Sequence, residues 1–160
     1  MSKTSKKAAS GPLKTHWMIY GANGYSAQLA IEKAVSQGLT PILAGRNRAA
    51  IEALAATHGL DMRIFDLTDI ELVVAQLADV QLVSNCAGPL SATAEPMMRA
   101  CLEAGTHYTD IAGEISVFDA AQALDAEAKK AGVVLCPGVG FDVIPTDCMA
   151  GYLHDAMPDA

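Results

Sequence analysis

IYGANGYSA, residues 19–27, joins the end of a strand-like run to the start of a helical one. Residues 17–20 are apolar and favour a strand, whereas apolar residues recur with helical spacing from Ala27 to Val35. Gly21 and Gly24 therefore lie at a strand-to-helix junction, where the absence of a Cβ atom permits a tight turn and a close approach to the backbone.

A phosphate group is the ligand that such a junction is suited to bind. The backbone N–H groups and the dipole of a helix N-terminus both favour negative charge. We therefore expect a pyrophosphate to contact this turn, through Gly21, Asn23, Gly24, Tyr25 and Ser26. The spacing is G-x-x-G-x-x-A rather than G-x-G-x-x-G, so a plain glycine turn of an α/β domain is the alternative.

The composition of the 160 residues fits a core of small aliphatic side chains. Hydrophobic residues make up 51% of the chain and aromatic residues only 5%, which is typical of thin-layered α/β folds. The net charge of −7 argues against nucleic acid, or an anionic membrane surface, as the main partner. No apolar run approaches the roughly 18 residues that a membrane span requires.

The four cysteines form no CxxC motif, and the four histidines do not cluster with them in the sequence. We therefore predict no metal site. Because the chain shows no export signal, we expect reduced thiols and a cytoplasmic location. Residues 1–15 are polar and basic, and we expect them to form a solvated tail.

Glycines mark the places where helical patterns give way to extended ones, as expected of residues that end helices in the left-handed conformation. They are Gly38, Gly59, Gly105 and Gly132. With the first strand, the extended segments predict six strands, at residues 17–20, 41–44, 62–65, 80–84, 107–111 and 133–136. Strands that alternate with helices in this way favour a doubly wound, mostly parallel, Rossmann-like α/β sheet with helices on both faces.

Helix starts have sequence signals as well. Thr68 with Glu71, and Ser116 with Asp119, have the spacing of a capping box, and Pro96 suits a first helical turn. We expect the Rossmann-like domain to span residues 16–145, and a further helix to occupy residues 146–160.

The residues that follow each strand are the candidates for ligand binding, because ligands of such sheets bind outside the carboxyl ends of the strands. After the second strand, Arg46 and Asn47 stand where an NAD-binding domain would usually place an acidic residue. Arg46 can pair with a 2′-phosphate and Asn47 can donate to it, so we predict NADP(H) rather than NAD. A solvated Arg46 beside an Asn47 that caps the next helix is the alternative.

Two further strand ends supply candidates. Asp66 can accept from the adenine amino group while Leu67 packs on the ring, although Asp66 equally suits a simple turn before Thr68. After the fourth strand, small residues suit a backbone that runs beside a ribose, and these are Cys86, Ala87, Gly88 and Pro89. The sequence places no basic residue near Cys86 that would lower the pKa of its thiol. We therefore interpret Cys86 as a packed small residue rather than a reactive thiol.

Taken together, these motifs resemble the NADP-binding domain of the saccharopine dehydrogenase-like superfamily, including its trans-acting enoyl reductase branch. The resemblance covers residues 17–150, in order. It rests on GANGYSA at 21–27, AGRN at 44–47, NCAGP at 85–89, HYTDIAGE at 107–114 and PGVGFDVIPTD at 137–147. Ala27 departs from the pattern by replacing a third glycine, and residues 90–94 lack the aromatic residue and glycine that the family has there.

The resemblance implies an NADP(H)-dependent oxidoreductase that transfers hydride to or from an enoyl, imine or related small or lipid-like substrate. It also implies a second domain that binds this substrate, and the chain ends about where that domain would begin. We expect such a domain, or a second copy of the chain, to pack on residues 146–160, where apolar residues have helical spacing. A module that binds NADP without turnover is the alternative function.

No catalytic residue can be assigned from the sequence. The Tyr-x-x-x-Lys pair of short-chain dehydrogenases is absent, because Gly24, Leu29, Ala112 and Ala156 stand four residues after the tyrosines. Four residues near the ends of the fifth and sixth strands could contact a substrate, and helix capping, turn bonding or contacts to a further domain explain them as well. They are Tyr108, Asp110, Glu114 and Asp142.

Overall fold

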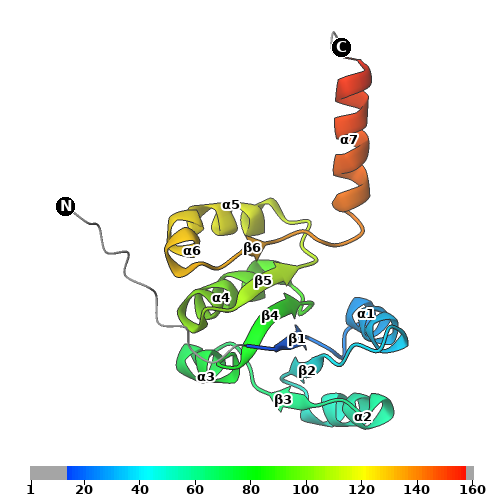
Figure 1. Ribbon diagram of the computed structural model, residues 1–160, viewed down its shortest axis with the longest axis vertical. Coiled ribbons are helices and arrows are strands. Elements are labelled where there is room, and N and C mark those ends of the chain that lie inside the picture. Colours follow the sequence, from blue (N-terminus) through cyan, green and yellow to red (C-terminus); the bar gives the residue numbers. More distant parts are fainter. Residues whose placement is uncertain (1–13, 158–160) are drawn as a thin grey trace, which may run out of the picture.

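Six parallel strands form a single sheet in the computed structural model, which describes residues 14–157 (Figure 1). The strands are β1 (His16–Tyr20), β2 (Ile42–Gly45), β3 (Met62–Ile64), β4 (Val80–Asn85), β5 (His107–Asp110) and β6 (Leu135–Cys136). Their order in the sheet is β3-β2-β1-β4-β5-β6, and every neighbouring pair is parallel. This is the doubly wound order of dinucleotide-binding folds, so the predicted fold class is confirmed.

Helices cover both faces of the sheet. They are α1 (Tyr25–Ser36), α2 (Arg48–His58), α3 (Ile70–Gln76), α4 (Leu90–Ala104), α5 (Ile115–Ala123), α6 (Asp125–Ala131) and α7 (Ile144–Ala156). The helices α1 and α2 lie on one face, and α3 to α6 lie on the other (Figure 1). Alternate residues of β1 serve the two layers, since Ile19 packs with α1 and α2 whereas Met18 and Tyr20 pack on the opposite side.

The ends of the elements differ in places from the sequence prediction. The four predicted glycines all have a positive φ at or just beyond a helix end. Strand β6 begins at residue 135 rather than 133, because the Val133 N–H donates to the carbonyl of Ala128 and still belongs to the exit from α6.

The three predicted helix starts are wrong in position. Asp69 rather than Thr68 caps α3, accepting from the Leu72 N–H at 3.1 Å, because the Thr68 hydroxyl is already bonded to Asp66. Helix α5 begins at Ile115, so Ser116 lies within its first turn. Pro96 lies inside α4, which begins directly after Pro89.

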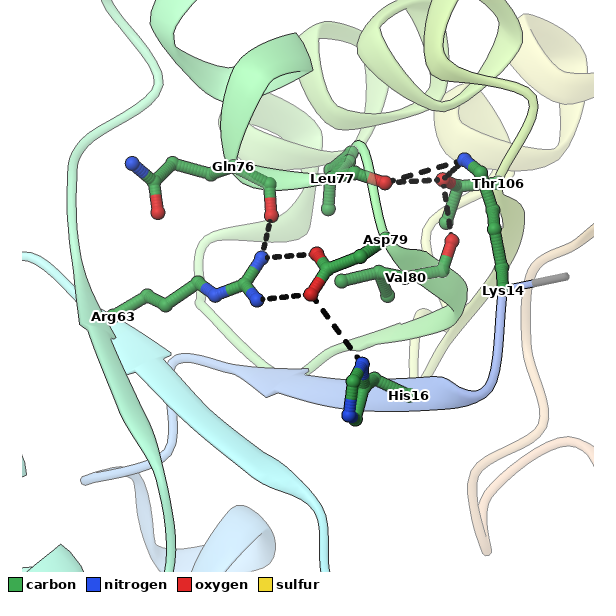
Figure 2. A network of polar contacts seen from close by, with 8 residues as sticks. All are labelled: Lys14, His16, Arg63, Gln76, Leu77, Asp79, Val80 and Thr106. Carbon is green, nitrogen blue, oxygen red and sulfur yellow. Dashed lines mark hydrogen bonds and ion pairs between the residues drawn. The ribbon is translucent and has the colours of Figure 1, made fainter. Parts of the chain in front are cut away.

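The amino ends of the strands are joined by a network of polar contacts (Figure 2). Lys14 Nζ donates to the carbonyls of Leu77 and Ala104, at 3.2 and 2.6 Å, and to Thr106 Oγ1 at 3.1 Å. Leu77 and Ala104 lie at the C-terminal ends of α3 and α4, where a cation is favourable. Lys14 is therefore an anchor and not part of a solvated tail, whereas residues 1–13 of the predicted tail lie outside the described residues.

The second half of this network links the edge strand β3 to the start of β4. Arg63 pairs with both carboxylate oxygens of Asp79, each at 2.8 Å, and also donates to the carbonyl of Gln76. These hydrogen bonds hold the pKa of Asp79 below its usual value. His16 Nδ1 lies 3.3 Å from the same carboxylate, so β1 joins the network too. No ligand-binding role was predicted for these residues.

Replacing Lys14 with methionine is expected to lower the free energy of unfolding by about 1.5–3 kcal/mol, because three acceptors lose one charged donor. Urea unfolding followed by circular dichroism measures this change. Lys33→Met is the matched control, since Lys33 is exposed on α1. Equal stabilities of the two variants would contradict the anchoring role.

Helix α7 projects away from the sheet (Figure 1) and buries none of its residues. It begins at Ile144, two residues before the predicted start. Its apolar residues Met149, Tyr152 and Leu153 are all exposed, as is Met157 directly after it. Residues 158–160 of the predicted helix lie outside the described residues. Between residues 14 and 157, no helix combines the length and the apolar character needed to cross a membrane.

Candidate functional site

A pocket of about 470 Å³ opens at the carboxyl ends of the first four strands. It lies where the strand order reverses between β1 and β4, the position at which doubly wound sheets bind ligands. Four segments supply its lining. They are Tyr20, Gly21, Asn23 and Gly24 at the end of β1 and after it; Gly45 and Arg46 around the end of β2; Asp66, Leu67 and Thr68 after β3; and Cys86, Ala87, Gly88 and Pro89 after β4, with Ala92, Thr93 and Pro96 of α4.

The glycine turn after β1 packs directly against the loop after β4. Gly21 has a φ of +77°, and a Cβ atom on it would lie 2.6–2.8 Å from the backbone and side chain of Ala87. Its N–H donates to the carbonyl of Ala44 at 2.8 Å, which fixes the turn to β2. Only glycine satisfies both the backbone conformation and the contact at this position.

Gly24 stands at the N-cap of α1, where no side chain caps the first helical turn. A Cβ atom on Gly24 would lie 3.2 Å from the carbonyl oxygen of Gly21 and 3.7 Å from that of Cys86. The N-terminus of α1 thus borders a small cradle that a larger side chain would fill. An uncapped helix N-terminus beside such a cradle fits a phosphate group.

Arg46 brings positive charge to the other end of the pocket. It is exposed, and within residues 14–157 it makes no hydrogen bond or ion pair, which leaves its guanidinium available to a ligand. Nearby, Tyr20 donates to the carbonyl of Phe65 at 3.3 Å, and burial raises the pKa of Tyr20 to about 12. The phenol therefore stays protonated and is a neutral part of the pocket lining.

Asp66 forms the turn before Thr68, which was one of the two roles predicted for it. Its Oδ1 accepts from the Thr68 N–H at 2.9 Å and from the Thr68 hydroxyl. These bonds hold the pKa of Asp66 below its usual value, so the carboxylate is charged at neutral pH. Asp66 also lines the pocket, and its contact with an adenine remains a prediction.

Cys86 is a packed residue of the loop after β4. Its N–H donates to the carbonyl of Tyr20 at 2.8 Å, and burial raises the pKa of its thiol. Both facts agree with a small structural residue rather than a reactive thiol. The peptide bond between Gly88 and Pro89, further along the same loop, is cis.

Ten of the thirteen residues predicted to bind a ligand line this pocket, and Tyr25, Ser26 and Asn47 do not. Tyr25 is 81% exposed, and Ser26 is exposed as well; both lie at the start of α1, beside the cradle, and their contact with a cofactor stays a prediction. Asn47 caps α2, its side-chain oxygen accepting from the Ala50 N–H at 3.3 Å. This cap uses only the side-chain oxygen of Asn47, so the donation of its NH₂ group to a 2′-phosphate stays a prediction.

Six lining residues were missed by sequence reasoning: Tyr20, Gly45, Thr68, Ala92, Thr93 and Pro96. Tyr20, Gly45 and Thr68 adjoin predicted residues, so their adjacency was an available signal. Ala92, Thr93 and Pro96 come from the first two turns of α4, and no motif in the sequence marks them as ligand-binding residues.

Two of the four possible substrate contacts are excluded by burial. Tyr108 and Asp110 have no exposed surface and bond to each other at 2.6 Å. Glu114 and Asp142 are exposed; the carboxylate of Glu114 accepts from the Gly113 N–H, and the backbone carbonyl of Asp142 accepts from Thr146. Among residues 14–157, no group of three histidine, cysteine or acidic side chains is arranged to hold a metal ion.

The sequence of residues 17–136 matches the family described as the saccharopine dehydrogenase NADP binding domain. The chain belongs to this family. The resemblance drawn from the motifs is thereby confirmed, as is NADP(H) as the cofactor, since the family is defined by binding it.

Two curated proteins are similar in sequence to this saccharopine dehydrogenase-like chain. It is 26% identical to the saccharopine dehydrogenase-like oxidoreductase of Homo sapiens, over 89% of this chain and 38% of the relative. It is 28% identical to the trans-acting enoyl reductase of Mycobacterium tuberculosis, over 86% of this chain and 35% of the relative. The chain thus spans little more than a third of the length of these relatives.

Solved structures agree on the fold of this saccharopine dehydrogenase-like chain. Apo saccharopine dehydrogenase (L-Glu forming) from Saccharomyces cerevisiae matches with a TM-score of 0.76 at 22% identity, over 91% of this chain and 32% of that one. The Citrobacter sp. triphenylmethane reductase complexed with NADP(H) matches with a TM-score of 0.59 at 18% identity, over 74% of this chain and 47% of that one.

Proposed function

We propose that this chain is the cofactor-binding part of an NADP(H)-dependent oxidoreductase, and that the pocket at the ends of β1 to β4 holds the cofactor. The observation that carries the proposal is that one pocket combines an open glycine cradle at α1 with the exposed guanidinium of Arg46. A dinucleotide phosphate needs both, a helix N-terminus for its pyrophosphate and a cation for its 2′-phosphate.

Each loop of the pocket then has a role in binding. The turn from Gly21 to Gly24 holds the pyrophosphate, and Arg46 pairs with the 2′-phosphate. Asp66 and Leu67 border the adenine, and the loop after β4 runs beside a ribose. The bound cofactor supplies hydride transfer, so the chain itself needs to provide position and charge rather than a nucleophile.

The substrate belongs, in this proposal, to the enoyl, imine or related small or lipid-like compounds. The support is the relationship to oxidoreductases that include a trans-acting enoyl reductase. We propose that residues outside this chain make the substrate contacts and cover the exposed apolar residues of α7. The 160-residue chain is then expected to bind NADPH and to turn over none of these substrates. NADPH oxidation by the isolated chain would contradict this part.

Arg46→Glu is expected to weaken NADPH binding by about 1.5–3 kcal/mol, tenfold or more, and to narrow or reverse the preference for NADPH over NADH. The reason is the loss of a charge-assisted pair with the 2′-phosphate, which NADH lacks. Calorimetric titration of both cofactors into both proteins measures the effect. Equal constants for NADPH and NADH in the unaltered chain would refute the pocket assignment of Arg46.

Arg48→Glu is the matched control for this change. Arg48 lies two residues further on, pairs with Glu52 within α2 at 2.9 Å, and does not line the pocket. The same reversal of charge there should reduce NADPH affinity much less than Arg46→Glu does. A similar loss from both variants would point to long-range charge rather than a contact.

A further inference from the structure

A buried chain of hydrogen bonds leads from the end of β5 to the wall of the pocket. Asp110, with no exposed surface, accepts at Oδ2 from the Tyr108 hydroxyl at 2.6 Å. Its Oδ1 accepts from the N–H groups of Ala112 and Gly138, at 2.9 and 2.8 Å. The carboxylate therefore ties the end of β5 to the segment that follows β6.

The chain continues from Tyr108 through Asn85 to the loop after β4. Asn85 Nδ2 donates to Tyr108 Oη and to Thr93 Oγ1, each at 3.3 Å. Asn85 Oδ1 accepts from the Ala87 N–H at 3.1 Å, and the Thr93 hydroxyl donates to the carbonyl of Ala87 at 2.5 Å. Both backbone polar groups of Ala87 are thus held by this chain.

The direction of every bond in the chain follows from Asp110. A carboxylate only accepts, so the Tyr108 hydroxyl must donate to it and is left to accept from Asn85. Burial, with the hydrogen bond to Asp110, raises the pKa of Tyr108, so its proton stays in place. Asn85 must then turn its NH₂ group toward Tyr108 and its oxygen toward Ala87. The reverse orientation would set oxygen against oxygen and N–H against N–H.

We infer that Asp110 is a positioning residue for the cofactor pocket, because its fixed acceptor character sets the orientation of the Asn85 amide and so the place of Ala87. The inference rests on the proposed function, since Ala87 lines the proposed cofactor site and packs against Gly21. No atom of Asp110 needs to touch the cofactor.

The test exchanges the acceptor for a donor without changing the size of the side chain. In Asp110→Asn the amide oxygen keeps Ala112 and Gly138, and an NH₂ group then faces the Tyr108 hydroxyl. That hydroxyl finds its acceptor only if Asn85 turns over, which sets an NH₂ group against the Ala87 N–H. We expect NADPH to bind about tenfold more weakly, and the Ala87 amide resonance to move in the NMR spectrum of the free protein.

A second substitution separates positioning from stability. Tyr108→Phe in the Asp110→Asn background removes the hydroxyl that needs an acceptor, so Asn85 can keep its original orientation. NADPH affinity should recover to within about threefold of the unaltered chain while the unfolding free energy stays low, whereas a merely structural role would weaken binding further. Thr106→Val is the control, because Thr106 is equally buried and bonded but lies at the opposite end of the sheet.

The outcomes are distinct. NADPH affinity of Asp110→Asn within about twofold of the unaltered chain, or no recovery in the double variant, would overturn the inference. If Asp110→Asn does not fold, Thr93→Val decides, since Thr93 is only partly buried and an unchanged Ala87 resonance there would also overturn it. If the unaltered chain fails to bind NADPH, the proposed function fails, and the Ala87 resonance in the free Asp110→Asn protein still tests the positioning role.

Discussion

Gly21→Ala is expected to abolish measurable NADPH binding and to lower the free energy of unfolding by about 3–5 kcal/mol. Two costs add at this position. Alanine is strained at a φ of +77°, and its Cβ would lie 2.6–2.8 Å from Ala87, in which the nearest atoms are backbone. Either the turn after β1 or the loop after β4 must move, and both line the pocket.

Gly38→Ala isolates the first of these costs. Gly38 has almost the same φ, +76°, but a Cβ atom added there would meet nothing within 4 Å, so only backbone strain of about 1–2 kcal/mol is expected. Chemical denaturation and calorimetric titration with NADPH measure both variants. If the two substitutions cost the same stability and both proteins bind NADPH, the contact between the two loops is unimportant.

Gly24→Val is expected to weaken NADPH binding at least about 100-fold while the protein stays folded. The φ of Gly24 is −72°, which any residue adopts, so the backbone is not strained. The new side chain would begin 3.2 Å from the Gly21 carbonyl and fill the cradle at the start of α1. The loss is therefore one of space for the pyrophosphate rather than of stability.

Gly151→Val is the matched control, because Gly151 lies on exposed α7 with no atom within 4 Å of an added Cβ. It should bind NADPH as the unaltered chain does. Circular dichroism spectra of both variants report whether the fold is kept. A folded Gly24→Val protein with normal NADPH affinity would place the phosphate site elsewhere.

The sequence was sufficient for the fold and for most of the pocket, for a specific physical reason. In a parallel sheet every strand ends at the same edge, so residues that follow strands in the sequence meet in space. Gly21, Arg46, Asp66 and Ala87 are far apart in the chain and line one pocket on that account. To predict these residues, it was enough to locate the strand ends, which the glycines and apolar runs mark in the sequence.

What the sequence left open depends on competition between neighbours. Thr68 has the spacing of a capping residue, but its hydroxyl bonds to Asp66, and Asp69 caps α3 instead. Asn47 suits both a phosphate contact and a helix cap; the structure shows that its oxygen caps α2, and the phosphate contact stays a prediction. Local sequence patterns indicate which hydrogen bonds a side chain can make. They do not indicate which of the possible partners it bonds in the folded protein.

Contacts across long sequence separations were beyond sequence reasoning. Lys14 reaches acceptors 63 to 92 residues away, and nothing around Lys14 distinguishes it from the basic residues before it. The bond from the Gly138 N–H to Asp110, 28 residues earlier, likewise appears only when β5 and the segment after β6 lie side by side. Such residues read as surface or catalytic candidates until the sheet is assembled.

The division of β1 and β2 between two layers has a consequence for synthesis on the ribosome. The buried residues of the smaller cluster, from Ile19 to Ala55, are all available once β3 has emerged. Met18, Tyr20, Ile42 and Ala44 face the other way and belong to the larger cluster, which includes residues of α4, a helix that ends only at Ala104. A nascent chain of intermediate length therefore carries a half-covered sheet with one bare apolar face, the kind of surface that chaperones bind and that drives aggregation.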